Sequence, residues 1–193
     1  IKTADPSIVV VSGGPTPAGD VPGAAIDDIN FLNAMYAAGL KGVSDAVGVH
    51  PSGYNCPATA AWQTVTDPAA VFRGPFDNRH HSWCFRGTME GYRDVMVANG
   101  DADKRLWPTE FGWAVSSTPQ TGYEYAGDNT REEQAAWIVE AFQQAEAWGW
   151  VGPMSLRTLN YDITRPGSEQ AAFSILTAEG PTPAYNALAN LPE

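Results

Sequence analysis

The sequence predicts an α/β fold with a parallel sheet, because segments of strand composition alternate with segments of helical spacing along the chain. Strands are expected over residues 8–13, 43–50, 105–113 and 152–162, and helices over residues 26–40, 85–100, 128–150 and 182–191. Right-handed crossovers join parallel strands in such a pattern. The alternation is typical of an open doubly wound sheet or of part of a closed barrel.

Each of these elements has a local reason. The stretch IVVVSG (8–13) is rich in β-branched residues, as a buried parallel strand is. Asn129 or Thr130 can cap the helix over 128–150, whose first turn contains two glutamates, and Pro183 suits the first turn of the last helix. The helix over 26–40 is predicted by apolar residues at helical spacing, namely Ile26, Ile29, Leu32, Met35 and Tyr36.

The amino-acid composition and the net charge limit the kinds of molecule that the chain can bind. The chain has 193 residues, enough for one domain, and a formal charge of −11, which argues against nucleic acid or an anionic membrane as a partner. No apolar run approaches the roughly 18 residues of a membrane span. Charged residues make up only 17%, while Trp and Tyr number seven each, and this mixture suits sugar binding because sugar rings stack on aromatic faces.

A long loop over residues 51–82 is expected to be ordered, because it carries several aromatic residues. Cys56 and Cys84 flank most of it and form either a disulfide or two buried thiols. A disulfide would indicate an oxidising location. Without a C-x-x-C pattern or a recognised cluster of histidines, no zinc or other metal site is expected. Without a glycine-rich phosphate loop, no nucleotide or other cofactor is expected.

Polar and aromatic side chains stand at the carboxyl ends of the last three predicted strands. They are His50 with Tyr54, Glu110 with Trp113, and Asn160 with Tyr161 and Asp162. Because the carboxyl ends of parallel strands meet at one edge, these groups are expected to converge there. Trp83 and Trp113, with Tyr54, are candidates for a platform that stacks on a sugar, although Trp83 equally suits packing of the loop.

Four segments carry a resemblance to a known group of enzymes. WPTEFGW (107–113) resembles the seventh-strand motif of clan A glycoside hydrolases, which are retaining (β/α)8-barrel enzymes. IKTADPSIVVVSGG is similar to the approach to the fifth strand, DAVGVHPSGYN to the sixth strand, and WVGPMSLRTLNYD to the eighth. The resemblance implies that residues 1–193 are a single half-barrel domain of four βα units, similar to bacterial enzymes of families 39 and 5.

The same resemblance implies the roles of several residues. Glu110 matches the nucleophile of β-glycoside hydrolysis, and His50 matches a sixth-strand histidine near it. Ser52 stands where related sequences have a tyrosine, which leaves the nearby Tyr54 as its substitute. The expected contacts to a carbohydrate substrate therefore come from His50, Tyr54, Trp113, Asn160 and Arg157.

Two departures from the resemblance bear on catalysis. No Asn-Glu pair exists in the chain, so the usual acid/base motif is absent, and Arg157 stands where a tryptophan is usual. Arg157 can form an ion pair with Glu110, or its stem can fill space while its charged head reaches solvent. Asp162 is the one other carboxyl group considered for catalysis, although it better suits the capping of a loop. The alternative to an enzyme is a catalytically silent half-barrel that binds carbohydrate or serves a structural role.

A half-barrel leaves the outer edges of its sheet unpaired, and such edges favour association. The chain is therefore expected to form a homodimer or to pair with a complementary N-terminal half-barrel, as part of a longer enzyme or as a separate protein. The expected location is extracellular or on a bacterial cell surface.

Overall fold

The computed structural model describes residues 1–192 of the chain. Six α-helices, four 3-10 helices and four short strands are defined within them. In chain order they are α1 (Asp28–Ala37), η1 (Leu40–Gly42), β1 (Ala46–Val49), α2 (Gly74–Asp77), η2 (His81–Trp83), α3 (Phe85–Ala98), β2 (Arg105–Pro108), η3 (Glu124–Gly127), α4 (Arg131–Trp148), α5 (Tyr161–Thr164), η4 (Glu169–Phe173), β3 (Leu176–Thr177), β4 (Gly180–Pro181) and α6 (Pro183–Ala189).

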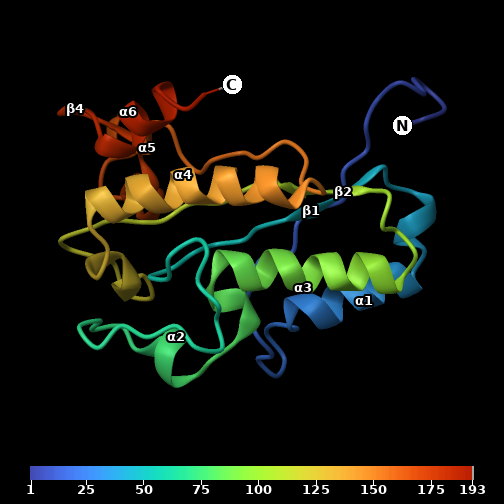
Figure 1. The fold of residues 1–193 in the computed structure, drawn as a ribbon, viewed down its shortest axis with the longest axis horizontal. Coiled ribbons are helices and arrows are strands. Elements are labelled where there is room, and N and C mark those ends of the chain that lie inside the picture. The colour runs from blue at the N-terminus through green and yellow to red at the C-terminus, as the bar shows by residue number, and fades with distance from the viewer. Residues whose placement is uncertain (193) are drawn as a thin grey trace.

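The centre of the fold is a parallel pair of strands. β1 and β2 pair from Ala46 opposite Arg105 to Val49 opposite Pro108. All four residues of β1 are buried, as expected for a parallel strand that is covered on both faces. Figure 1 shows this pair passing between α3 and α4. The parallel direction predicted from the sequence is confirmed for these two strands.

The first and last predicted strands are present only as isolated bridges. Val11 forms a parallel bridge with Ala46, and on the other side of the pair Val151 and Leu156 form parallel bridges with β2 and with the residues just after it. The segments beside β1 and β2 therefore run in the predicted parallel direction. Four full strands are not confirmed, because only β1 and β2 form a continuous ladder among the described residues.

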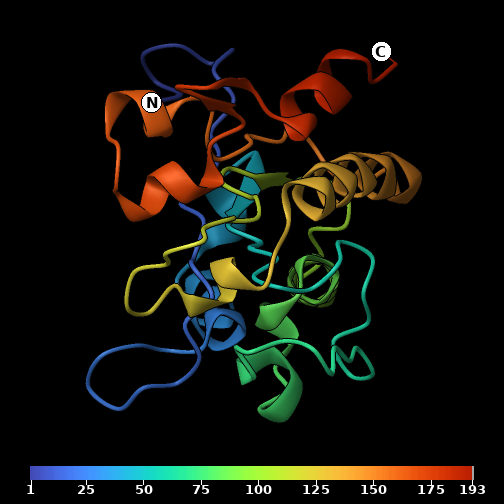
Figure 2. The same cartoon turned by 90° about the vertical axis from the view of Figure 1, so that its left-hand side faces the viewer.

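The helices were predicted closely where a capping residue defines their start. α4 begins after Thr130 with a capping box, in which the Thr130 side chain accepts from the Glu133 N–H and the Glu133 side chain accepts from the Thr130 N–H. α1 packs against α3, and α4 packs against α6 (Figures 1 and 2). α1 is shorter than predicted because Asp27 caps it, and Ile26 lies outside it and is exposed. Within residues 1–192, no helix combines the length and the apolar character that crossing a membrane requires.

The core lies between the strands and the long helices. Leu32, Val47, Leu106, Phe111 and Ile138 are among its fully or almost fully buried residues. The sequence predicted a strand as far as residue 162 and assigned no element to residues 163–181, but this part of the chain contains α5, η4 and the β3–β4 hairpin. These elements are only two to five residues long, so periodicity could not reveal them.

Candidate active site

Glu110 lies directly beyond β2, at the carboxyl edge of the parallel pair. The Thr109 N–H donates to the Val49 carbonyl at 3.0 Å, which carries the pairing of β1 and β2 one residue past the strand. The carboxylate of Glu110 therefore sits at the edge where chemistry collects in parallel α/β folds. Half of this side chain is exposed (50%), so substrate-sized molecules can reach it.

Arg157 reaches Glu110 from the neighbouring segment. Its Nη1 lies 3.3 Å from Glu110 Oε2, and its guanidinium carbon lies 5.0 Å from the centre of the Phe173 ring. The Arg157 N–H also donates to the Phe111 carbonyl at 2.9 Å, which positions the start of the side chain beside the motif. The ion pair predicted from the sequence is thus present, and stacking on Phe173 holds the guanidinium in place.

His50 follows β1 at the same edge. Its Nδ1 lies 3.1 Å from the Thr16 hydroxyl. Burial lowers the pKa of His50 below its usual value, and the Arg157 charge lowers it further, whereas the Glu110 carboxylate raises it. The opposite influences of Glu110 and Arg157 place all three groups in one electrostatic cluster. We refer to His50, Glu110 and Arg157 together as the polar edge.

Two glycines allow this close approach. A Cβ on Gly14 would lie 2.8 Å from His50 Cδ2 and 3.0 Å from the Thr109 hydroxyl, so the backbone of residue 14 fits against both only without a side chain. A Cβ on Gly112 would lie 2.5 Å from the Arg157 carbonyl oxygen. The glycine of the TEFGW motif therefore lets the segment that carries Arg157 lie beside the one that carries Glu110.

Trp113 occupies a different environment from the one expected. Its side chain is fully buried (0% exposed) and packs against Phe85 and Trp137, and its indole N–H donates to the Cys56 carbonyl at 2.8 Å. No face of the ring is free to stack on a sugar. The prediction that Trp113 contacts the carbohydrate is therefore wrong, and the ring packs in the core instead. Gly53 makes room for the indole, because any Cβ there would overlap it.

Tyr54 and Trp83 form part of a separate pocket. Their ring centres are 4.8 Å apart in an edge-to-face arrangement, and Tyr54 also packs edge-to-face on Tyr125. Burial, followed by the charges of Asp28 and Tyr123, raises the pKa of Tyr54 to about 12, so its hydroxyl stays protonated at neutral pH. The pocket has a volume of about 470 Å³ and is lined by Pro17, Ala18, Gly19, Tyr54, Asn78, Arg79, His80, Ser82 and Trp83.

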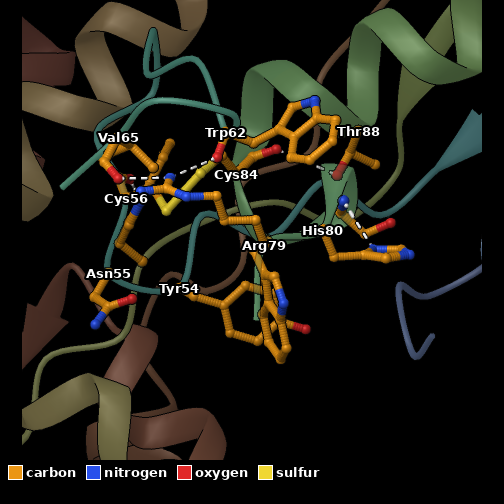
Figure 3. Close-up of a disulfide and its surroundings, with 12 residues drawn as sticks. Tyr54, Asn55, Cys56, Trp62, Val65, Arg79, His80, Cys84 and Thr88 are labelled. Atoms are coloured by element: carbon orange, nitrogen blue, oxygen red, sulfur yellow. Dashed lines mark hydrogen bonds between the residues drawn. A yellow bond between two sulfur atoms is a disulfide. The ribbon is translucent and has the colours of Figure 1, made fainter. Parts of the chain in front are cut away.

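The long loop is anchored firmly on this side of the molecule. A disulfide joins Cys56 and Cys84, whose Cα atoms are 5.4 Å apart (Figure 3). Near it, the Arg79 guanidinium donates to the carbonyl oxygens of Trp62 and Val65 (Figure 3). Of the two states of the cysteines left open by the sequence, the structure has the disulfide. We call residues 51–84 the anchored loop.

The two remaining candidates on the last segment do not join the polar edge. Asn160 is the N-cap of α5, and its carbonyl accepts hydrogen bonds from the N–H groups of Ile163 and Thr164. Asp162 accepts a hydrogen bond from the Ala178 N–H at 3.0 Å, which ties α5 to the β3–β4 hairpin. This is the capping of a loop that the sequence favoured for Asp162, and no contact between the described residues links either side chain to Glu110.

Two polar residues support the motif in roles that the sequence did not indicate, since Asn129 was considered only as a helix cap and Gln134 was not considered. Asn129 donates from its amide to the carbonyl oxygens of Tyr54 and Ala114, both at 2.8 Å, and so joins the anchored loop to the motif. Gln134 is buried in the first turns of α4 and donates to the Trp113 carbonyl at 2.7 Å. A glutamine on the core-facing side of a helix was the signal that could have revealed the second of these.

Comparisons with known proteins place this geometry in a recognisable class of fold. No protein-family model and no curated protein matches the chain. Solved structures of glycoside hydrolases do match it. A family 39 glycoside hydrolase from Bacteroides cellulosilyticus WH2 aligns with 97% of the chain at 22% identity and a TM-score of 0.63. A monomeric β-xylosidase from Caulobacter crescentus CB15 aligns with all of it at 22% identity and a TM-score of 0.57.

A third structure extends the likeness to another family. The GH128 endo-β-1,3-glucanase from Amycolatopsis mediterranei aligns with 93% of the chain at 15% identity and a TM-score of 0.50. The chain spans about a third of the first two proteins, 34% and 35% of their length, and 57% of the third. At these identities the likeness shows the fold. The resemblance to glycoside hydrolases seen in the sequence is thus confirmed as a mixed α/β fold that matches part of their barrels.

Proposed function

We propose that the chain is the C-terminal half of a retaining β-glycoside hydrolase barrel, with four βα units and Glu110 as the nucleophile. The observation that carries the proposal is the position of the Glu110 carboxylate, exposed at the carboxyl edge of β1 and β2 and flanked by His50 and Arg157. The likeness to a family 39 glycoside hydrolase and to a β-xylosidase supports a β-glycoside as the substrate class.

In this mechanism a Glu110 oxygen attacks the anomeric carbon, and the bond to the leaving oxygen breaks. Water then hydrolyses the covalent glycosyl-enzyme and restores the carboxylate. The Arg157 ion pair keeps Glu110 in place before attack but must loosen as the carboxylate charge is lost to the new bond. His50 adds a polar group beside the reacting carboxylate, and Tyr54 lines the pocket of the anchored loop.

The chain needs a second carboxyl group to protonate the leaving oxygen. Retaining enzymes hold the two carboxyl groups about 5 to 5.5 Å apart. Among residues 1–192, Glu110 has an arginine as its ion-pair partner, and no contact links it to another carboxyl group. We therefore propose that the acid/base comes from a complementary N-terminal half-barrel or from a second copy of the chain in a homodimer. We further propose a bacterial extracellular or cell-surface location, which the disulfide supports.

The test uses substrates that do not need the missing acid. Aryl β-glycosides with strongly acidic phenol leaving groups, such as dinitrophenyl β-xylosides and β-glucosides, depart without protonation. The chain is expected to cleave them slowly and to be labelled at Glu110 by a 2-deoxy-2-fluoro glycosyl fluoride, detected by mass spectrometry of peptides. Glu110→Gln should abolish both, whereas the control Glu146→Gln, at an exposed position of α4, should change neither.

The second candidate is a silent half-barrel that binds carbohydrate without turnover. The Glu110–Arg157 ion pair favours it, because a carboxylate held by a guanidinium is a weaker nucleophile. Absence of labelling and turnover in the wild-type chain, together with saturable binding of xylo- or gluco-oligosaccharides by calorimetry, would support this candidate and contradict the first.

A further inference from the structure

A second cluster of polar side chains lies apart from the polar edge, where the start of α1 meets η2. Asp27 caps α1 and Asp28 is its first residue, and His80 and His81 lie at the start of η2. One ligand atom from each of the four residues lies within 4.8 Å of those of the other three. The two histidine rings are neighbours as well, with their centres 4.1 Å apart.

The distances between these atoms resemble those between ligands that share one ion. His80 Nε2 is 3.0 Å and His81 Nε2 is 4.0 Å from Asp27 Oδ2, and His81 Nε2 is 3.2 Å from Asp28 Oδ1. In a tetrahedral zinc site with bonds of about 2.0–2.1 Å, neighbouring ligand atoms are roughly 3.3 Å apart. Only the widest separations in the cluster must shorten, by about 1 to 1.5 Å, to meet that geometry.

Two buried carboxylate oxygens in the cluster have no hydrogen bond. The side chain of Asp28 is fully buried (0% exposed), and the side chain of Asp27 is 11% exposed. Within residues 1–192, neither carboxylate accepts a hydrogen bond at its Oδ2 atom. The 3.0 Å contact between His80 and Asp27 Oδ2 has the distance of an ion pair without the direction of a hydrogen bond. Two adjacent carboxylates in such a place need compensating positive charge, because burying unpaired charge is costly.

Other contacts hold the ligands in position, as around established metal centres. Asp27 Oδ1 accepts from the Asn30 N–H at 3.0 Å, and Asp28 Oδ1 accepts from the Ser82 hydroxyl at 2.5 Å. Coordination through His80 Nε2 requires the ring proton on Nδ1, and this costs one long hydrogen bond, at 3.3 Å, from the Ser82 N–H. The competing arrangement is a metal-free network closed by histidine protons. The Tyr92 hydroxyl, whose pKa is raised chiefly by burial and by the Asp28 carboxylate, donates at 3.4 Å to the Pro15 carbonyl and must turn from it to join such a network.

We propose that Asp27, Asp28, His80 and His81 bind one divalent transition-metal ion, with zinc preferred. Two imidazole nitrogens and two carboxylate oxygens favour zinc over calcium or magnesium, which prefer oxygen ligands only. The ion fixes the start of α1 against η2. Because His80 and Ser82 also line the pocket beside Tyr54 and Trp83, the ion stabilises one wall of that pocket.

This inference departs from the expectation that the chain has no metal site. That expectation rested on the absence of a C-x-x-C pattern and of clustered histidines, and it overlooked the adjacent pair His80 and His81. The ligands here are an Asp-Asp pair and this His-His pair, which are 53 residues apart in the sequence and meet only in the fold. The chain has three histidines, so His50 offers a natural control.

The test measures zinc binding by the full chain after dialysis against a chelator and then against metal-free buffer. Equilibrium dialysis with ZnCl2 and elemental analysis should give one zinc per chain. His80→Gln and Asp27→Asn should weaken binding at least about tenfold, because each removes a ligand and loss of a mere outer-shell partner already costs roughly that much. His50→Gln and Asp103→Asn, which change a histidine and an exposed carboxylate elsewhere, should bind as the wild type does.

Two further readouts keep the proposal falsifiable if a variant folds poorly. CoCl2 should produce the intense visible absorption of a four-coordinate site in the wild type but not in His80→Gln. ZnCl2 should raise the melting temperature of the wild type and of the two control variants, but not that of His80→Gln. His80 is partly exposed, so metal-free circular dichroism should show that its variant folds. Failure of the wild type to bind stoichiometric zinc, or equal binding by wild type and both ligand variants, would overturn the proposal in favour of the metal-free network.

Discussion

Two side chains of the WPTEFGW motif, three positions apart, lie in opposite environments, one at the polar edge and the other packed against the anchored loop. Glu110 exposes half of its side chain and is held by one ion pair at 3.3 Å, whereas Trp113 is fully buried and attached to Cys56 by its indole N–H. An exposed ion pair typically contributes less than about 1 kcal/mol, and a buried tryptophan contributes several. The comparison shows that Glu110, at one end of the motif, stays accessible to solvent, whereas Trp113, at the other end, holds the loop whose residues line the pocket.

The largest loss of stability is expected when the contact between Trp113 and the anchored loop is removed. Trp113→Ala should lower the free energy of unfolding by about 3–5 kcal/mol, because it leaves a cavity in the core. It also leaves the Cys56 carbonyl without its donor. Urea unfolding followed by circular dichroism measures the change. Glu110→Gln and Arg157→Gln are the matched variants on the open side, and they should each shift stability by less than about 1 kcal/mol. Equal losses on both sides would contradict the comparison.

The disulfide is expected to contribute slightly less. Replacing both Cys56 and Cys84 by alanine removes a link across 28 residues, and the chain-entropy model assigns such a link about 3–4 kcal/mol. The same urea experiment measures it, and limited proteolysis should show the first cleavage within residues 57–83. A double variant that unfolds at the wild-type urea concentration, with no new cleavage there, would show that packing alone holds the anchored loop.

The smallest effect concerns proton binding at the polar edge. His50 should titrate below 6.5 in the folded chain, because burial disfavours its charged form. Glu110→Gln should lower this pKa further by removing a negative charge, and Arg157→Gln should raise it by removing a positive one. NMR titration of the histidine ring protons measures both shifts. Shifts of the same sign in the two variants would place His50 outside the cluster.

The sign of the linked stability change follows from the same shift. The unfolded chain takes up a proton on His50 near pH 6.5, and the folded chain does so only at lower pH. The contribution of neutral His50 to stability is therefore present above pH 6.5 and is lost as the pH falls below it. His50→Gln should remove this part of the pH dependence of the urea midpoint.

Local sequence predicted a good part of the fold. Thr130 and Glu133 define the start of α4 by a capping box that depends only on neighbouring residues. The buried strand β1 lies inside the segment 43–50 that was predicted as a strand. The pairing of Arg157 with Glu110 was one of two alternatives that the sequence left open for this arginine, and the structure has the ion pair. The outer strands could not be predicted, since whether a segment extends into a ladder depends on the partner beside it.

What the sequence alone determined is the chemistry available and the order of the elements, because composition, caps and periodicity are local properties. It determined that a glutamate would follow a parallel strand and that two cysteines would lie 28 positions apart. Only the tertiary structure decided which way each side chain of the motif faces and that Asp28 meets His81. Burial and contacts between distant residues are set by how the whole chain packs, and no stretch of sequence contains them by itself.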